Sequence, residues 1–398
     1  MKLRKCAEEL GTTADMLAKG MAEDSGKVSP EAAERLGEDV KRIVEALSVF
    51  GVAAQIVKIH QGPTVNQIEL ALPIGCRYGS VADLAGELQA ALGCRSLRIE
   101  APIPGSDKVG VEYERSDPEP VTFADTARPE IARLDALRKR PYLPMVVGRD
   151  VNREVVSLDL AELPHLLVGG ESDRDKWMFL DNLICGLVSV RSPEELKLII
   201  FDPHLNGLSR YDGLPHLSVP VIHENRRMVF ALHWAVCELQ KRFESFARAG
   251  VRNIAEYNAR VIKAGDSPDE FPENLPYIVI VMGEIAELVT ECKKDVVPEI
   301  SRLTQKARAA GIHLVLATHC VESQVVSGTI KANIPGRIAL KTATSRASRE
   351  ILDDAGAECL IGEGDALWCG QYGVLCRVQI PDISDEDIKD VIGRYGNE

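Results

Sequence analysis

The stretch at residues 166–177, LLVGGESDRDKW, has the outline of a nucleotide-binding phosphate loop. An apolar run leads into Gly169 and Gly170, and Lys176 follows at the spacing of a lysine that reaches a bound phosphate. Such a loop holds phosphates with backbone N–H groups at the start of a helix. Gly169, Gly170 and Lys176 are therefore the candidate nucleotide-binding residues.

The rest of this loop departs from the pattern at three positions. Asp173 and Asp175 stand where glycines would let the backbone approach the phosphates, and Trp177 stands where a Ser or Thr hydroxyl would ligate Mg²⁺. Within residues 171–176, three acidic residues against two basic ones also give the loop a negative charge, which disfavours a polyanion. The alternative is an ordinary strand–turn–helix junction with a solvated acidic turn.

Seven stretches between residues 164 and 367 form a characteristic series of motifs. They are PHLLVGG (164–170), DGLPHL (212–217), GVRNIAEYN (250–258), LPYIVIVMGEIAEL (275–288), QKARAAGIHLVLAT (305–318), IKANIPGRIAL (330–340) and SREILDDAGAECLIGEGDAL (348–367). Together they resemble the motor domain of the FtsK/SpoIIIE family of bacterial DNA translocases, over residues 142–398. Residues 30–114 resemble, more weakly, the small alpha domain that precedes this motor. The resemblance implies an α/β fold, with a RecA-like P-loop NTPase core and a mainly parallel sheet, preceded by a small α+β domain.

The resemblance also implies roles for two charged residues. The run at 277–282 resembles the Walker B strand, which in the family ends in Asp-Glu; here Gly283 takes the place of the Asp and Glu284 matches the Glu. In the family the Asp organises Mg²⁺ and the Glu activates the attacking water. Arg308 matches the arginine finger that reaches a neighbouring subunit's nucleotide. The implied catalytic residues are Glu284 and Arg308; the alternatives are a solvated carboxylate at a strand end and a helix-surface arginine.

Basic residues that face DNA are implied in the same way. Cys320 stands where the family has an arginine, and Ser345 replaces a lysine, with Arg346 one residue along. Lys331 and Arg349 match two other basic positions. The candidate DNA-binding residues are therefore Lys331, Arg346 and Arg349.

Composition limits the class of protein. The 398 residues carry a net charge of −13, which argues against a surface that coats DNA broadly. No apolar run approaches the ~18 residues of a membrane helix, and the N-terminus has no signal-peptide core. The ten cysteines form no CxxC pair and the eight histidines form no ligand pattern. We therefore expect reduced thiols, no metal site and a cytoplasmic location.

The pattern of apolar residues predicts the organisation of the first third of the chain. Residues 1–29 form an N-terminal segment with a short helix at 14–22, and residues 30–114 form a small α+β domain. The predicted elements of that domain are helices at 30–49 and 81–92 and strands at 52–59, 67–72, 96–100 and 109–114. Residues 115–141 are charged and without a period, which predicts a linker or one short helix at 127–139.

From residue 142 onward, apolar runs alternate with helical stretches. The predicted strands are 166–168, 197–201, 219–222, 277–281 and 313–317, and the predicted long helices include 178–190 and 226–249. This alternation predicts a parallel sheet covered on both faces, whose ligands bind beyond the carboxyl ends of the strands. The loop, Asp202, Gly283, Glu284 and residues 318–320 should therefore meet in one crevice.

Three functions remain open. The first is an FtsK/SpoIIIE-like protein that has lost efficient ATP hydrolysis. It would act without a cofactor as a scaffold or regulatory subunit, in a homo-oligomer such as a hexameric ring or with an active paralogue. The second is a residual translocase of double-stranded DNA that uses ATP and Mg²⁺, in chromosome segregation or DNA transfer. The third is a ring that binds DNA, weakly, without any nucleotide.

Overall fold

The computed structural model describes residues 30–137, 142–205, 207–264, 274–319, 328–370 and 372–395. The helix predicted at residues 14–22 and the position Cys320 lie outside these ranges. The described residues form two compact units. The first unit comprises the described residues through Pro120 together with 149–154 and 359–361, and the second comprises the remainder.

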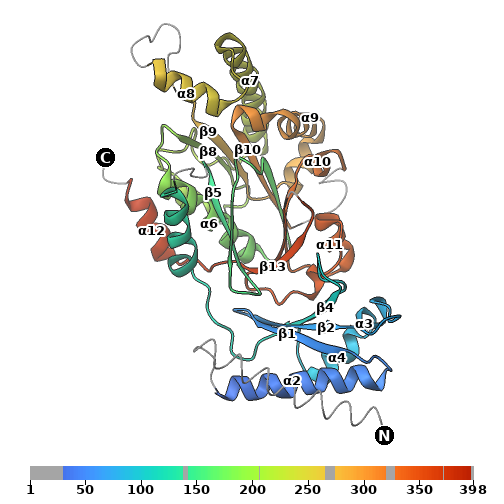
Figure 1. The fold of residues 1–398 in the computed structure, drawn as a ribbon. Helices are drawn as coiled ribbons and strands as arrows, with labels where there is room; N and C mark the ends of the chain where they lie inside the picture. The colour runs from blue at the N-terminus through green and yellow to red at the C-terminus, as the bar shows by residue number, and fades with distance from the viewer. Residues whose placement is uncertain are drawn as a thin grey trace. The chain divides into compact units, whose positions relative to one another are not determined.

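The first unit is a four-stranded antiparallel sheet with helices packed against it (Figure 1). In sheet order, the strands are β1 (Gln55–Gln61), β2 (Val65–Ala71), β4 (Lys108–Glu114) and β3 (Leu97–Glu100); the helices are α2 (Pro30–Val49), α3 (Gly79–Ala82) and α4 (Ala85–Leu92). Helix α2 buries Val40, Ile43 and Leu47 at helical spacing in the same hydrophobic core as Ile68 of β2. All four predicted strands of this unit are present, whereas the helix predicted at 81–92 is divided into α3 and α4.

The second unit is built on a nine-stranded sheet of order β6-β5-β13-β12-β11-β7-β10-β9-β8. The strands are β5 (Pro144–Asp150), β6 (Val155–Asp159), β7 (His165–Gly169), β8 (Leu196–Phe201), β9 (Tyr277–Met282), β10 (Ile312–Thr318), β11 (Gly336–Leu340), β12 (Asp365–Cys369) and β13 (Leu375–Gln379). Neighbours from β11 to β8 run parallel, while β12 pairs antiparallel with β11 and β13. The parallel part brings the carboxyl ends of β7, β9 and β10 to one edge, which positions the site.

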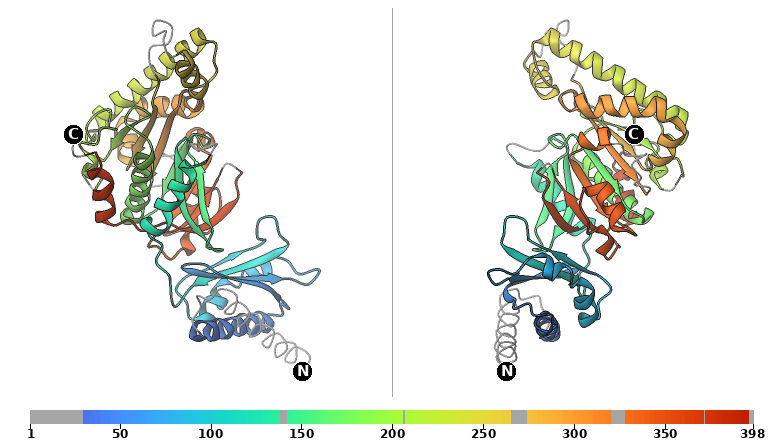
Figure 2. Two further views of the ribbon diagram at one scale, coloured as in Figure 1. Left: turned by 60° about the vertical axis from the view of Figure 1, so that its left-hand side comes forward. Right: turned by 90° about the vertical axis from the view of Figure 1, so that its right-hand side faces the viewer.

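The helices of this unit pack with one another in two groups. The helices are α5 (Arg128–Asp135), α6 (Asp173–Val190), α7 (Asn225–Ala249), α8 (Ile254–Ala264), α9 (Ala286–Ala310), α10 (Gly328–Ala332), α11 (Ser345–Leu352) and α12 (Asp385–Gly393). Helix α6 packs with α5 and α12, and α9 packs with α7, α10 and β10. Figure 2 shows the long helix α7 running beside α9.

The strand predicted at 219–222 is not formed. Leu217 and Ile222 make isolated bridges to Leu198 and Phe201 of β8, and Pro220 between them has no N–H to donate to a ladder. An irregular segment therefore runs along the edge strand of the sheet.

The segment predicted as a linker or one short helix contains two helical elements. A π-helix at Phe123–Ala127 leads into α5, and Phe123, Ile131 and Leu134 are buried in the second unit. Helix α5 agrees with the predicted alternative of one short helix at 127–139, and Ile131 and Leu134, three residues apart, form its buried face.

Candidate functional site

The phosphate-loop sequence follows β7 directly and turns into α6. An added Cβ at Gly170 would lie 2.5 Å from Cβ of Leu340, so this turn requires a glycine. The Ser172 hydroxyl accepts a hydrogen bond from the N–H of Asp175 at 3.2 Å and caps α6, which begins at Asp173. The helix thus starts five residues before the predicted start at Met178, with its acidic residues in the first turn, where the helix dipole favours them.

Asp175 is directed to a neighbouring turn. It is buried, and burial raises the pKa of its carboxyl, against a hydrogen bond from the backbone of Gly364 and one with Ser172. Gly364 lies just before β12. The residue that replaces the loop glycine therefore ties the loop to the turn before β12.

The side chain of Lys176 is held inside the protein by two carboxylates. It is only 1% exposed, and its Nζ lies 2.8 Å from Oδ1 of Asp173 and 3.3 Å from Oε2 of Glu284. The hydrogen bond from Lys176 lowers the pKa of the more exposed Asp173. The ammonium group that would meet a phosphate is therefore already neutralised.

Glu284 is the centre of this network. Its Oε1 accepts hydrogen bonds from the N–H of Ala286 at 2.8 Å and the hydroxyl of Thr318 at 2.7 Å. Its Oε2 accepts from the N–H of His319 at 2.9 Å and lies 2.6 Å from His319 Nδ1. Both oxygens are thus engaged in addition to Lys176, and neither is left to accept a proton from a water.

The charge state of Glu284 follows from these partners. Burial alone would raise the pKa of this carboxyl. The N–H of Ala286, the charge of Lys176, the N–H of His319 and the hydroxyl of Thr318 together outweigh burial, so the pKa lies below its usual value. Glu284 is therefore a buried carboxylate whose hydrogen bonds come from protein groups, and it joins β9, α9, β10 and the loop.

Trp177 and Gly283 meet at the other side of the crevice. Trp177 is 8% exposed, and an added Cβ at Gly283 would lie 2.6 Å from Cζ3 and from Cη2 of the indole ring. On its other side that Cβ would be 3.3 Å from the carbonyl oxygen of Phe201. The ring occupies the space into which a side chain at position 283 would extend.

Most of the predicted crevice is therefore assembled. The loop, Glu284 and residues 318–319 meet as expected from the ends of β7, β9 and β10. Asp202, at the end of β8, accepts hydrogen bonds from the N–H groups of Gly207 and Leu208 at the start of a short 3-10 helix. The sequence placed residues 318 and 319 at this edge but assigned no hydrogen bonds to them. Ser172 was missed, and a Ser followed by an acidic first turn was the available signal for it.

Arg308 lies apart from this network. It is exposed in the last turn of α9, which ends at Gly311 with a left-handed backbone. A cation is favourable there because of the helix dipole. Its predicted role as an arginine finger requires a neighbouring subunit and stays a prediction.

The predicted DNA-binding residues lie around α10 and α11. Lys331 Nζ is 2.6 Å from Oδ1 of Asp353 and donates to the carbonyl oxygen of Arg349 at 3.0 Å, and Arg337 pairs with the same Asp353. Burial would raise the pKa of Asp353, but hydrogen bonds from Lys331 and Arg337 hold it below its usual value. Lys331 is therefore balanced within the protein, whereas Arg346 and Arg349 are exposed on α11.

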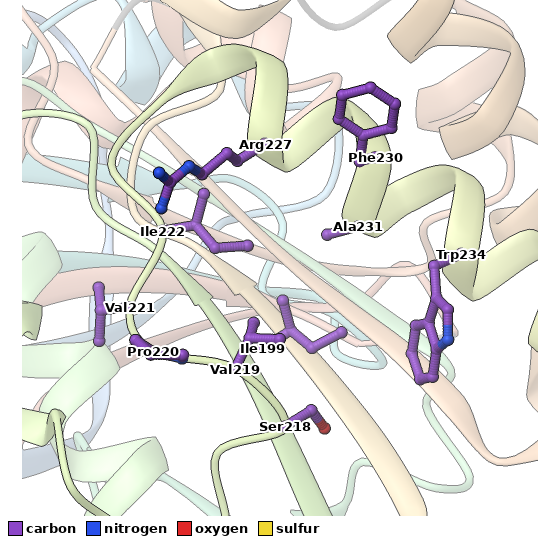
Figure 3. A pocket seen from close by; sticks show the side chains of 10 residues that line it. All are labelled: Ile199, Ser218, Val219, Pro220, Val221, Ile222, Arg227, Phe230, Ala231 and Trp234. Atoms are coloured by element: carbon purple, nitrogen blue, oxygen red, sulfur yellow. The ribbon is translucent and has the colours of Figure 1, made fainter.

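A separate hollow lies beside the edge strand. A cavity of about 550 Å³ opens between β8, residues 218–222 and α7, and Figure 3 shows Phe230 and Trp234 of α7 on one side of it and Ile199 on another. Its lining is apolar apart from Ser218 and Arg227. None of the predicted site residues lines it, so it is distinct from the crevice.

Two further properties hold for the part of the chain that the structure describes. No helix there combines the length and apolar character needed to span a bilayer. No group of three or more His, Cys, Asp or Glu side chains there has an arrangement that could hold a metal ion.

Family models match both parts of the sequence. Residues 131–328 match the FtsK/SpoIIIE family, and residues 13–113 match the FtsK alpha domain. The DNA translocase FtsK of Halalkalibacterium halodurans is 36% identical over 358 residues, which is 90% of this chain and 45% of that protein. The DNA translocase FtsK of Clostridium tetani is 37% identical over 369 residues, 92% of this chain and 48% of that protein. The chain thus spans less than half the length of these relatives.

Solved structures share the fold at lower sequence identity. The pCW3 conjugation coupling protein TcpA, in a monomer form with ATPgS, has a TM-score of 0.60 at 19% identity and covers 90% of this chain and 99% of its own. The cytoplasmic domain of the type VII secretion ATPase EccC of Thermomonospora curvata has a TM-score of 0.57 at 22% identity, over 66% of this chain and 32% of its own. These similarities confirm the predicted α/β fold, a P-loop NTPase core preceded by a small α+β domain.

Proposed function

Because the chain belongs to the FtsK/SpoIIIE family, we propose that it is an FtsK-like protein that has lost efficient ATP hydrolysis. It serves as a non-catalytic scaffold or regulatory subunit of an oligomer, either a homo-oligomeric ring or a mixed assembly with an active paralogue. The observation that carries the proposal is the pairing of buried Lys176 with both Asp173 and Glu284.

The residues of the crevice do not fit a magnesium–nucleotide complex. A triphosphate would have to displace two carboxylates from Lys176 and then lie beside them, which like-charge repulsion opposes. Trp177 offers no oxygen to a metal ion, and Gly283 has no side chain. Glu284 has filled its hydrogen-bonding positions with protein donors. No hydrolytic step can be built from this set of contacts.

A residual ATP-driven translocase is the second candidate. Its support is the name of the relatives, DNA translocase FtsK, together with the retention of Lys176 and Glu284 at the matching positions. It requires that the Lys176 network opens when nucleotide arrives.

Nucleotide binding and turnover distinguish the two candidates. A ligand present at 100 times its Kd adds about 2.7 kcal/mol to the free energy of unfolding, so bound Mg-ATP would raise the melting temperature clearly. We expect no such rise, and no DNA-stimulated ATPase above that of Lys176→Ala and Glu284→Gln variants. The Halalkalibacterium halodurans relative, assayed in parallel, is the positive control. Turnover near ~10 s⁻¹ that both variants abolish would overturn the proposal.

A further inference from the structure

The two positions that would bind Mg²⁺ by the family resemblance, 177 and 283, differ from the expected residues in opposite ways. One side chain is larger than expected and the other is absent. Position 177, where a hydroxyl would ligate Mg²⁺, carries the largest side chain, and position 283, where a carboxylate would stand, carries none. The structure brings them into contact, since the indole ring lies where the first atom of a side chain at 283 would be placed. Two changes that look independent in the sequence therefore share one space.

The surroundings leave little room for either residue to adjust. Gly283 follows β9 and donates its N–H to the carbonyl oxygen of Phe201 at 2.9 Å, which fixes its backbone to β8. Trp177 is the fifth residue of α6 and follows Lys176, whose buried ion pair with Glu284 anchors this end of the helix. A Cβ at 283 would thus be enclosed between the outer edge of a buried indole ring and a backbone carbonyl oxygen.

We propose that Trp177 and Gly283 form a matched pair that excludes a divalent metal from the crevice, such that position 283 cannot regain a carboxylate while Trp177 remains, and a hydroxyl at 177 has no carboxylate opposite it while Gly283 remains. An aspartate at 283 would collide with the ring, and a serine at 177 facing Gly283 would leave the space of an indole unfilled. The pair explains why Mg²⁺ does not fit here, and in this sense it rests on the proposed loss of ATP hydrolysis.

A cycle of four proteins tests the contact without using activity. They are the wild type, Gly283→Ala, Trp177→Ser and the double variant Trp177→Ser/Gly283→Ala. We expect Gly283→Ala to lower the melting temperature by about 5 °C or more, because it overpacks the crevice. In the Trp177→Ser background the same alanine should cost nothing or raise the melting temperature, since it extends into vacated space.

Gly393 supplies the matched control for the glycine substitution. It ends α12 in the same unit, and an added Cβ there meets nothing within 4 Å. Gly393→Ala should therefore leave the melting temperature within about a degree of the wild type in both backgrounds. Equal losses from Gly283→Ala in the two backgrounds would overturn the pairing.

Metal binding tests the consequence of the pair. Mn²⁺ with ADP, followed by electron paramagnetic resonance, is the probe. We expect Trp177→Ser/Gly283→Asp to bind Mn·ADP at least ten times more tightly than either single variant, because only the double variant has room for the carboxylate and a hydroxyl beside it. A double variant that melts near the wild type and binds no better than the single variants would overturn the metal-excluding role.

The two proposals fail on different measurements. Turnover by the wild-type protein would overturn the loss of ATP hydrolysis and leave the melting-temperature cycle unchanged. Additive melting temperatures would overturn the matched pair and leave the turnover of the wild type where it was.

Discussion

Two buried ion pairs of the second unit have similar charges but connect different parts of the sheet. Arg377 and Asp365 lie on the antiparallel strands β13 and β12, where Nε and Nη2 of the arginine meet the two carboxylate oxygens at 3.0 and 2.7 Å. Lys176 and Glu284 are 108 residues apart in sequence, and they join the phosphate loop to the ends of β9 and β10. Both pairs are almost fully buried.

The comparison shows that the location of an ion pair in the sheet does not by itself determine its role. The hairpin pair stabilises neighbouring strands, and nothing about its place suggests catalysis. The crevice pair lies at the carboxyl ends of the parallel strands, where ligands bind in such sheets, and at positions for which the family resemblance predicts nucleotide chemistry, so its place favours catalysis. Its contacts are nevertheless those of a structural pair, because the hydrogen-bonding positions of the carboxylate are filled by protein groups. What decides the role of such a residue is how many of those positions remain open.

The largest expected loss of stability comes from replacing the basic residue of each ion pair with an uncharged one. Lys176→Met and Arg377→Met each remove the cation that is paired with a buried carboxylate, so each should lower the free energy of unfolding by about 3–5 kcal/mol. Urea unfolding followed by circular dichroism measures this. Lys389→Met, on an exposed lysine of α12, is the control and should stay within about 0.5 kcal/mol of the wild type. If Lys176→Met were as stable as the control, the lysine would be free for a ligand and the comparison would fail.

A smaller loss of folding stability is expected when the pH is lowered and Glu284 becomes protonated. The pKa of Glu284 is lower in the folded protein than its ordinary value, so its ionised form contributes stability above the ordinary carboxyl range. That contribution is lost as the pH falls below about 4.3, the usual value of a glutamate, toward the lower folded-state value. Urea midpoints from pH 7 to pH 3.5 should therefore fall more steeply for the wild type than for Glu284→Gln. Parallel curves would show that Glu284 is not held as an anion, whereas Glu386→Gln, on exposed α12, should match the wild-type slope.

The smallest effect concerns the third pair, Lys331 and Asp353, which is more exposed than the other two. Each phosphate contact contributes about −0.9 to the slope of log affinity against log salt concentration. Because Asp353 already balances Lys331, we expect weak duplex DNA binding whose salt slope hardly changes in Lys331→Ala. Filter binding from low to physiological salt measures the slope, with Arg346→Ala as the comparison. Tight binding at physiological salt that Lys331→Ala and Arg349→Ala abolish would favour a DNA-binding ring.

Much of the fold and part of the site followed from the sequence alone. The apolar runs at β7, β9 and β10 predicted a parallel sheet, and the ends of these strands predicted that the loop would meet Glu284 and residue 318. These signals are local, because a strand's apolar pattern and its following loop lie within a few residues of each other. The start of α6 could also have been predicted from Ser172 and the acidic residues after it.

The pairings inside the crevice could not have been predicted in the same way. Asp173 and Lys176 are three residues apart, a spacing that allows contact only if a helix already begins at Asp173. The contact of Trp177 with Gly283 joins residues on different elements, and depends on how α6 packs against the end of β9. Such contacts are set by tertiary packing, which neither periodicity nor a motif encodes.

The internal ion pairs of Lys176 have a consequence for the way this chain could behave in an assembly. A ligand shifts a conformational equilibrium only as far as it binds one state better than another. Asp173 and Glu284 are covalently part of the chain, so these partners of Lys176 stay beside it at a fixed local concentration and cannot diffuse away. Under the proposed loss of ATP hydrolysis, the crevice would keep one geometry whether nucleotide is abundant or scarce. In an assembly whose other subunits change conformation with bound nucleotide, such a chain would keep one conformation. It would then serve as the fixed subunit relative to which the others move.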